Sequence, residues 1–143
     1  MESGAAVKAV ALDLQALGDT TRLWEDWLAD AGRRARVDVS ALDEQLPNWR
    51  RLLERFAEDR APVYFRPDPE ANAALRRLRD ADVRIGVFTD APEELAAVAL
   101  SQLGAARQVD ELVAGESALE QLVARLGSET EVVRTREELT GLR

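Results

Sequence analysis

The sequence predicts an α/β fold of the Rossmann type: a parallel sheet of about four strands, flanked by helices, with a small helical insertion after the first strand. Two features of the chain predict this architecture. From residue 68 onward, short apolar runs alternate with segments of helical periodicity, the pattern of a parallel sheet with right-handed crossovers. The first apolar run is followed instead by a helical stretch over residues 19–63 before the alternation begins.

The first strand is predicted from residues 7–14, an apolar run that suits a strand buried on both faces of a sheet. From residue 19 onward the period becomes helical. Leu23, Trp27 and their apolar neighbours recur at helical spacing, and Gly32 is a natural C-terminal stop. We therefore expect a first inserted helix that ends at Gly32.

A second inserted helix is predicted behind Pro47, where Trp49 and later apolar residues again follow helical spacing. The two helices suggest a helical hairpin. Together with Trp24 and Trp27, Trp49 is expected to pack this hairpin on itself and on the sheet. The alternative is a hydrophobic lid or a self-association surface, such as that of a homodimer, because aromatic residues favour interfaces.

The remaining elements alternate. Asp68 followed by Pro69 is a strong helix start, because the side chain caps the helix and proline suits its first turn. Asp90 and Glu93 stand at capping-box spacing and predict another helix, which Gly104 closes. The other predicted elements are strands at 83–89, 109–113 and 131–134, a helix at 117–126 and a last helical turn at 137–142.

The composition excludes several classes of function. A net charge of −8 argues against a general nucleic-acid role, because phosphate backbones require clustered cations. Histidine and cysteine are absent, which excludes Ser-His and Cys-His catalysis and thiolate metal sites. No apolar run approaches the ~20 residues that span a bilayer, and residues 1–7 show no signal peptide. We therefore expect a cytoplasmic protein with no membrane partner.

Two polar residues end predicted strands, Asp13 and Thr89. In open parallel sheets, ligands bind outside the carboxyl ends of the strands. Asp90 and the backbone N–H groups after it begin a helix, which suits an anion. A carboxylate that faces a hydroxyl and a helix N-terminus is an arrangement for phosphoryl transfer, with Asp13 as nucleophile and Thr89 and Asp90 at the phosphate. The alternative is that Asp13 caps the strand end and Asp90 only caps the helix.

Residues 10–14, the insertion that begins at residue 19 and residues 86–90 together resemble the haloacid-dehalogenase superfamily of phosphohydrolases. Residues 66–69, which lead into a helix and then the second strand, are similar to its phosphoglycolate-phosphatase-like branch. The resemblance covers most of the chain.

The resemblance implies a role for each part. Asp13 would attack the phosphoryl group and Thr89 would hold the phosphate. Residues 19–63 would form a small helical cap, and residues 1–18 and 64–143 the α/β core.

The sequence departs from the family pattern in three places. The family's acid/base aspartate is replaced by Gln15, which cannot transfer a proton. The family's lysine is missing: Lys8, the only lysine, is at the start of the first strand, and residues 115–117 offer an acid instead. Residues 132–136 contain no acid where the family binds magnesium, and Glu137 and Glu138 are displaced from that position.

These departures weaken the expectation of a Mg²⁺ cofactor. Its remaining ligands would be Asp13 and the backbone carbonyl of Gln15. An arginine could replace the lysine, and the candidates are Arg66, Arg107 and Arg134.

The sequence as a whole predicts a protein of haloacid-dehalogenase type with weak or no phosphatase activity. One alternative is an active phosphatase for small phosphorylated molecules that uses Asp13. The other is a non-catalytic binding or assembly module.

Overall fold

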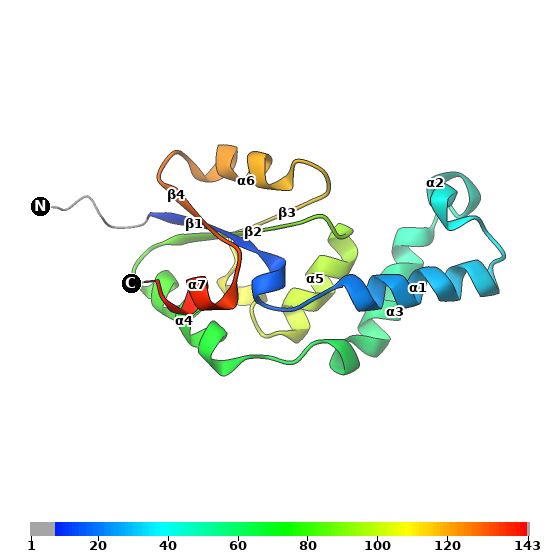
Figure 1. The fold of residues 1–143 in the computed structure, drawn as a ribbon, viewed down its shortest axis with the longest axis horizontal. Coiled ribbons are helices and arrows are strands. Elements are labelled where there is room, and N and C mark those ends of the chain that lie inside the picture. The colour runs from blue at the N-terminus through cyan, green and yellow to red at the C-terminus, as the bar shows by residue number, and fades with distance from the viewer. Residues whose placement is uncertain (1–7, 143) are drawn as a thin grey trace, which may run out of the picture.

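The computed structural model describes residues 8–142, and four parallel strands in the order β3-β2-β1-β4 form its sheet (Figure 1). Residues 1–7, on which the start of the predicted first strand and the expectation about a signal peptide rest, lie outside the described residues. The strands are β1 (Ala9–Asp13), β2 (Arg84–Thr89), β3 (Glu111–Ala114) and β4 (Thr130–Val133). The expectation that β1 lies between the second and fourth strands is confirmed.

The register brings the predicted site residues to one edge of the sheet. Asp13 at the end of β1 pairs with Phe88, one residue before Thr89, and Thr89 pairs with Ala114. Because all the strands are parallel, their carboxyl ends open toward the same side.

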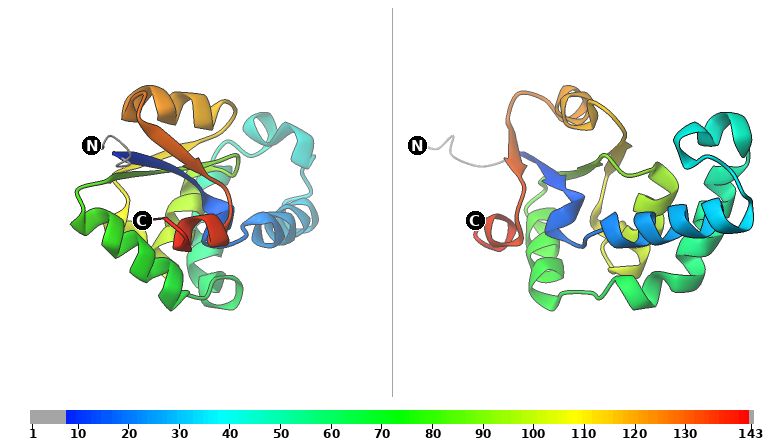
Figure 2. Two further views of the ribbon diagram at one scale, coloured as in Figure 1. Left: turned by 60° about the vertical axis from the view of Figure 1, so that its left-hand side comes forward. Right: turned by 45° about the vertical axis from the view of Figure 1, so that its right-hand side comes forward.

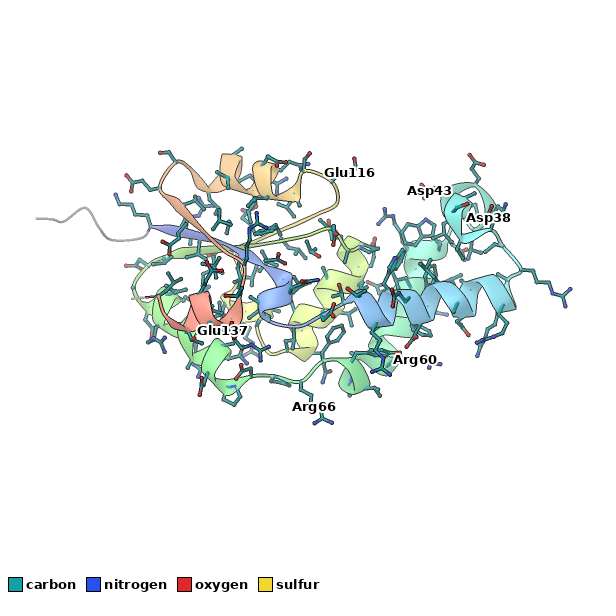
Figure 3. The ribbon with its side chains drawn as sticks, in the orientation of Figure 1. Asp38, Asp43, Arg60, Arg66, Glu116 and Glu137 are labelled. Carbon is teal, nitrogen blue, oxygen red and sulfur yellow. The ribbon has the colours of Figure 1, made fainter. Side chains whose placement is uncertain are left out.

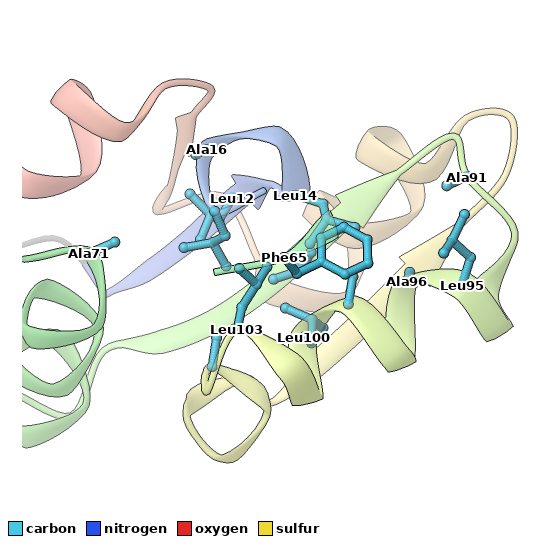
Figure 4. Packing of buried hydrophobic residues seen from close by; sticks show 14 of the residues in the cluster. Leu12, Leu14, Ala16, Phe65, Ala71, Ala91, Leu95, Ala96, Leu100 and Leu103 are labelled. Atoms are coloured by element: carbon cyan, nitrogen blue, oxygen red, sulfur yellow. The ribbon is translucent and has the colours of Figure 1, made fainter. Parts of the chain in front are cut away.

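Helices cover both faces of the sheet (Figures 1 and 2). Successive strand residues point to opposite faces, so Leu12 belongs to one hydrophobic core and Ala11 to the other. Leu12 packs in the larger core, with Leu100 of α5 (Figure 4). The smaller core lies under α6, where Leu122 is fully buried. The covering helices are α4 (Pro69–Asp80), α5 (Glu93–Gln102), α6 (Ala118–Leu126) and α7 (Arg136–Thr140).

Gly86 of β2 lets α6 approach the sheet closely. A Cβ atom at this position would lie 2.4 Å from Cδ1 of Leu122, whose side chain is fully buried. We expect Gly86→Ala to lower the free energy of unfolding by ~1–3 kcal/mol, because the packed core must shift to accept the methyl group. Urea denaturation measures the change. Because Leu122 is what the new methyl group would meet, the double variant Gly86→Ala/Leu122→Ala should lose less stability than the sum of the two single losses, and a loss equal to that sum would contradict the contact.

The insertion after β1 contains α1 (Thr21–Arg34), α2 (Leu42–Gln45) and α3 (Trp49–Tyr64). The prediction that Gly32 ends the first helix is wrong, because α1 continues to Arg34. Arg33 and Arg34 extend the helix by pairing with Asp30 at 3.2 and 3.0 Å, and cations suit a helix C-terminus. Arg36 follows with φ at +55°, so a non-glycine residue takes the left-handed position.

The three tryptophans pack on one another, as predicted for the core of the hairpin. The ring centroids of Trp24 and Trp27 are 5.5 Å apart, and the Trp49 centroid lies 5.9 Å from each. Trp27 and Trp49 are buried, and Trp24 is half-buried. Residues 35–48, which include α2, connect the two long helices, so their connection is longer than a simple turn.

The insertion also contacts the layer beneath it. α3 packs along α5, and Arg50 of α3 pairs with Glu94 of α5 at 3.0 Å. Two segments join the insertion to the sheet, and they meet where Gly18 approaches Phe65 and Leu103. A Cβ at Gly18 would lie 2.9 Å from Leu103 Cδ1, so this crossing is tightly packed. The division into a cap at 19–63 and a surrounding core stays a prediction.

No helix in the described residues 8–142 is both long and apolar enough to cross a membrane.

Candidate functional site at the carboxyl edge of the sheet

A cavity of about 550 Å³ lies at the carboxyl ends of the strands, beside the first turn of α6. We call it the strand-end cavity. It brings together Asp13, Gln15, Thr89 and Asp90, the site residues predicted from the sequence, although they come from two separate segments of the chain. Its polar and charged lining includes Asp13, Gln15, Thr20, Thr89, Asp90, Ser117, Glu120 and Arg134.

Asp13 is half-buried at the point where β1 turns into the short helix Leu14–Ala16. Its Oδ1 accepts a hydrogen bond from the Gln15 N–H at 3.0 Å. This bond is the strand-end capping that the sequence left as an alternative role. The Gln15 side chain is exposed, and both residues line the cavity.

Thr89 is buried, with 7% of its surface exposed, and its Oγ1 accepts a hydrogen bond from the Ala91 N–H at 3.1 Å. One backbone donor that could hold an anion is therefore already used within the protein. The first turn of α5 also carries Glu93 and Glu94, which place negative charge at that helix N-terminus.

The prediction that Asp90 caps the helix is wrong. α5 begins only at Glu93, its N-cap position is Pro92, and no side chain caps it. Proline favours extended backbone in the residue before it, so the helix starts after Pro92 and Asp90 lies too far ahead to reach its N–H groups. Asp90 is exposed instead and lines the strand-end cavity.

Of the cations considered as substitutes for the missing lysine, only Arg134 lines this cavity. Its Cζ atom lies 5.6 Å from the ring centroid of Phe88. Arg66 lies in the connection before α4 (Figure 3), and Arg107 lies in the turn before β3. Lys8 is at the opposite end of β1, where it pairs with Glu129 at 3.4 Å.

The turn after β4, where the resemblance implies a magnesium-binding acid, contains Arg134 and Thr135 and no acid. Glu138 accepts hydrogen bonds at 3.1 Å from the N–H groups of Arg134 and Thr135, and Thr135 accepts one from the Glu138 N–H, which completes a capping box. Its carboxylate is thus used to begin α7. Glu137 is exposed on the same helix (Figure 3).

The described residues do not fit a magnesium site of the kind that the resemblance implies. Within residues 8–142, no three acidic side chains lie close enough together to hold a metal ion. Oxygen ligands from several groups are what magnesium requires. Asp13 with the backbone of Gln15 does not make such a set.

Sequence reasoning missed Thr20, Ser117 and Glu120 as cavity residues. Ser117 has φ at +59° and precedes α6, and Glu120 lies in the first turn of that helix. With Asp13 and Asp90, Glu120 gives the cavity three carboxylates against the single guanidinium of Arg134. The sequence signal for Glu138 was present, because Thr135 and Glu138 have capping-box spacing.

No protein-family model matches the chain, and no curated protein matches it. Solved structures do. One is a protein from Thermotoga maritima assigned as a β-phosphoglucomutase, with a TM-score of 0.56 and 20% identity over 87% of this chain and 74% of that one. Another is a dehalogenase solved as an intermediate complex, with a TM-score of 0.53 and 14% identity over 90% of this chain and 76% of that one. At these identities the likeness concerns the fold alone, and it confirms the predicted α/β Rossmann-like architecture, a parallel sheet with flanking helices.

Proposed function

We propose that this protein is a relative of the phosphomonoester phosphatases of haloacid-dehalogenase type and that its phosphatase activity is weak or absent. One observation carries the proposal. The strand-end cavity contains Asp13 and Thr89, but it has glutamine at the acid/base position and three carboxylates with one guanidinium around them. A phosphate dianion in this cavity would meet net negative charge.

Magnitudes support weak activity. Loss of a general acid costs ~10²–10⁴ in rate. Loss of a cation or metal removes stabilisation of the charge on the transferred phosphoryl group, which is usually the largest catalytic effect. Losses within one site need not multiply. Either loss alone is nevertheless large enough that we do not expect the turnover of an efficient phosphatase.

The test is the hydrolysis of simple phosphomonoesters by the wild-type protein and by Asp13→Asn, with and without magnesium. We expect turnover far below the ~1–10³ per second of ordinary enzymes. Gln15→Asp should restore little, because a proton donor does not replace the missing charge stabilisation.

The control is Asp80→Asn, which removes a carboxylate on α4 at an exposed position that does not line the cavity. Magnesium-dependent turnover near one per second that Asp13→Asn abolishes and Asp80→Asn preserves would contradict the proposal. That result would favour an active phosphatase in which Arg134 replaces the missing lysine, since Arg134 lines the cavity. Arg134→Gln should then abolish turnover as well.

A further inference from the structure

A second and larger cavity, of about 610 Å³, lies under the inserted helices. We call it the cap cavity. α1, the segment with α2, the start of α3 and the loop after β2 line it. It shares Thr20 and Asp90 with the strand-end cavity, so the two cavities adjoin there. Its volume falls in the range of small-molecule sites.

The lining of the cap cavity combines aromatic rings with carboxylates. Trp24 and Trp49 contribute the rings, and Asp43, Glu44 and Asp90 contribute the negative charge. Asp43 is fixed beside a ring, because its Oδ1 accepts a hydrogen bond from Trp49 Nε1 at 2.7 Å (Figure 3 shows Asp43 at the α2 end of the insertion). No arginine or lysine from the described part of the chain lines this cavity.

Two rings of the inserted helices already contact cations, and one of them, that of Trp49, lines the cap cavity. The Cζ atom of Arg50 lies 4.4 Å from the ring centroid of Trp49, and that of Arg60 lies 4.3 Å from the ring centroid of Phe56. Neither arginine lines the cap cavity. A ring attracts a cation electrostatically through its face, and nearby carboxylates add to that attraction. Among residues 8–142, no such contact is found at the ring of Trp24, so this ring of the cavity can still attract a cation.

Thr20 points independently to a ligand. It is 7% exposed and lines both cavities. Its side chain makes no capping bond to α1, and among residues 8–142 its hydroxyl has no hydrogen-bond partner. Buried hydroxyl groups normally have a partner, because leaving one without costs free energy. A ligand that donates an N–H group to Thr20 Oγ1 would supply it.

We propose that the cap cavity binds an alkylammonium ion. Its N–H groups donate to Thr20 and to the carboxylate of Asp90, its methylene groups pack on Trp24 and Trp49, and Glu44 adds to the negative charge at the entrance. The net charge of −8 favours the approach of such a cation. This binding does not depend on chemistry at Asp13, so it stands or fails separately from the proposed weak phosphatase activity.

The tryptophans make the test direct. All three in the chain lie in the inserted helices, and two of them line the cap cavity, so intrinsic fluorescence reports its occupation. The probes are n-butylammonium chloride, neutral 1-butanol and sodium butyrate, each titrated into the intact protein. We expect a saturable fluorescence change with the ammonium ion alone, and we expect added salt to weaken it. Tetramethylammonium, which has no N–H group, should bind more weakly.

Three variants locate the site. Thr20→Val keeps the shape of the side chain and should weaken binding about fivefold or more, because it removes the acceptor. Glu44→Gln should weaken binding about twofold, as expected for an exposed charge. Glu25→Gln makes the same charge change at an exposed position of α1 that does not line the cavity, and it should leave the affinity unchanged.

Equal responses to butylammonium, butanol and butyrate would overturn the proposal, and so would unchanged affinity in Thr20→Val. If Thr20→Val fails to fold, the decision rests on Asp90→Asn and Glu44→Gln, two exposed sites, against Glu25→Gln. Equal affinity in all three would then refute the assignment.

Discussion

Replacement of Trp27 by alanine is expected to lower the free energy of unfolding by ~3–5 kcal/mol, the usual cost of removing a large buried aromatic side chain. Trp27 is 3% exposed and stacks on Trp24, and the ring centroid of Trp49 lies 5.9 Å from that of Trp27. Urea denaturation followed by far-ultraviolet circular dichroism measures the loss.

Trp24→Ala is the matched comparison, because Trp24 is in the same cluster but only half-buried. Its cost should be clearly smaller than that of Trp27→Ala. A wild-type melting temperature that falls on dilution, together with a Trp27→Ala melting temperature that does not depend on concentration, would show instead that Trp27 serves an interface between subunits.

A similar loss of ~3–5 kcal/mol is expected for Phe65→Ala. Phe65 follows α3 directly and is 1% exposed, and Figure 4 shows it among Leu12, Leu100 and Leu103. Its ring therefore fills the space where the insertion rejoins the sheet layer. We expect the variant to unfold at markedly lower urea concentration.

Val63→Ala provides the control two residues earlier, because Val63 is 80% exposed and its replacement should change stability by less than about 0.5 kcal/mol. Equal effects of Phe65→Ala and Val63→Ala would mean that the junction is not packed as described.

The strands and the helix starts that depend on neighbouring residues could be predicted from the sequence. Asp68 accepts a hydrogen bond from the Glu70 N–H at 3.1 Å, as its position before Pro69 indicated. Gly104 and Gly127 follow helices with φ at +76° and +106°, as expected for glycines that end helices. These signals are local, so one segment is enough to read them.

The errors arose where competing interactions decide. Gly32 carries a stop signal, yet the ion pairs of Asp30 continue α1 beyond it. Asp90 and Glu93 have the spacing of a capping box, yet Pro92 between them delays the helix. Spacing alone does not show which of two local preferences prevails.

Only the part of the candidate site that follows from the sheet topology could be predicted from the sequence. Asp13 and Thr89 were found because the ends of parallel strands meet at one edge. Thr20, Glu120 and Asp43 reach the two cavities from three helical segments, and their positions depend on how those segments pack. No periodicity in the sequence records that packing.

The central position of β1 also determines how the protein can assemble while it is being synthesised. Ala9 pairs with Arg84 on one side and with Thr130 on the other, so both partners of the earliest strand are made much later. Contacts between such distant residues form slowly, because long loops must close first. Until β4 arrives, a nascent chain carries an apolar strand with an open hydrogen-bonding edge, which another copy emerging nearby can occupy. The interval between synthesis of β2 and docking of β4 is therefore the period in which this protein is most exposed to aggregation.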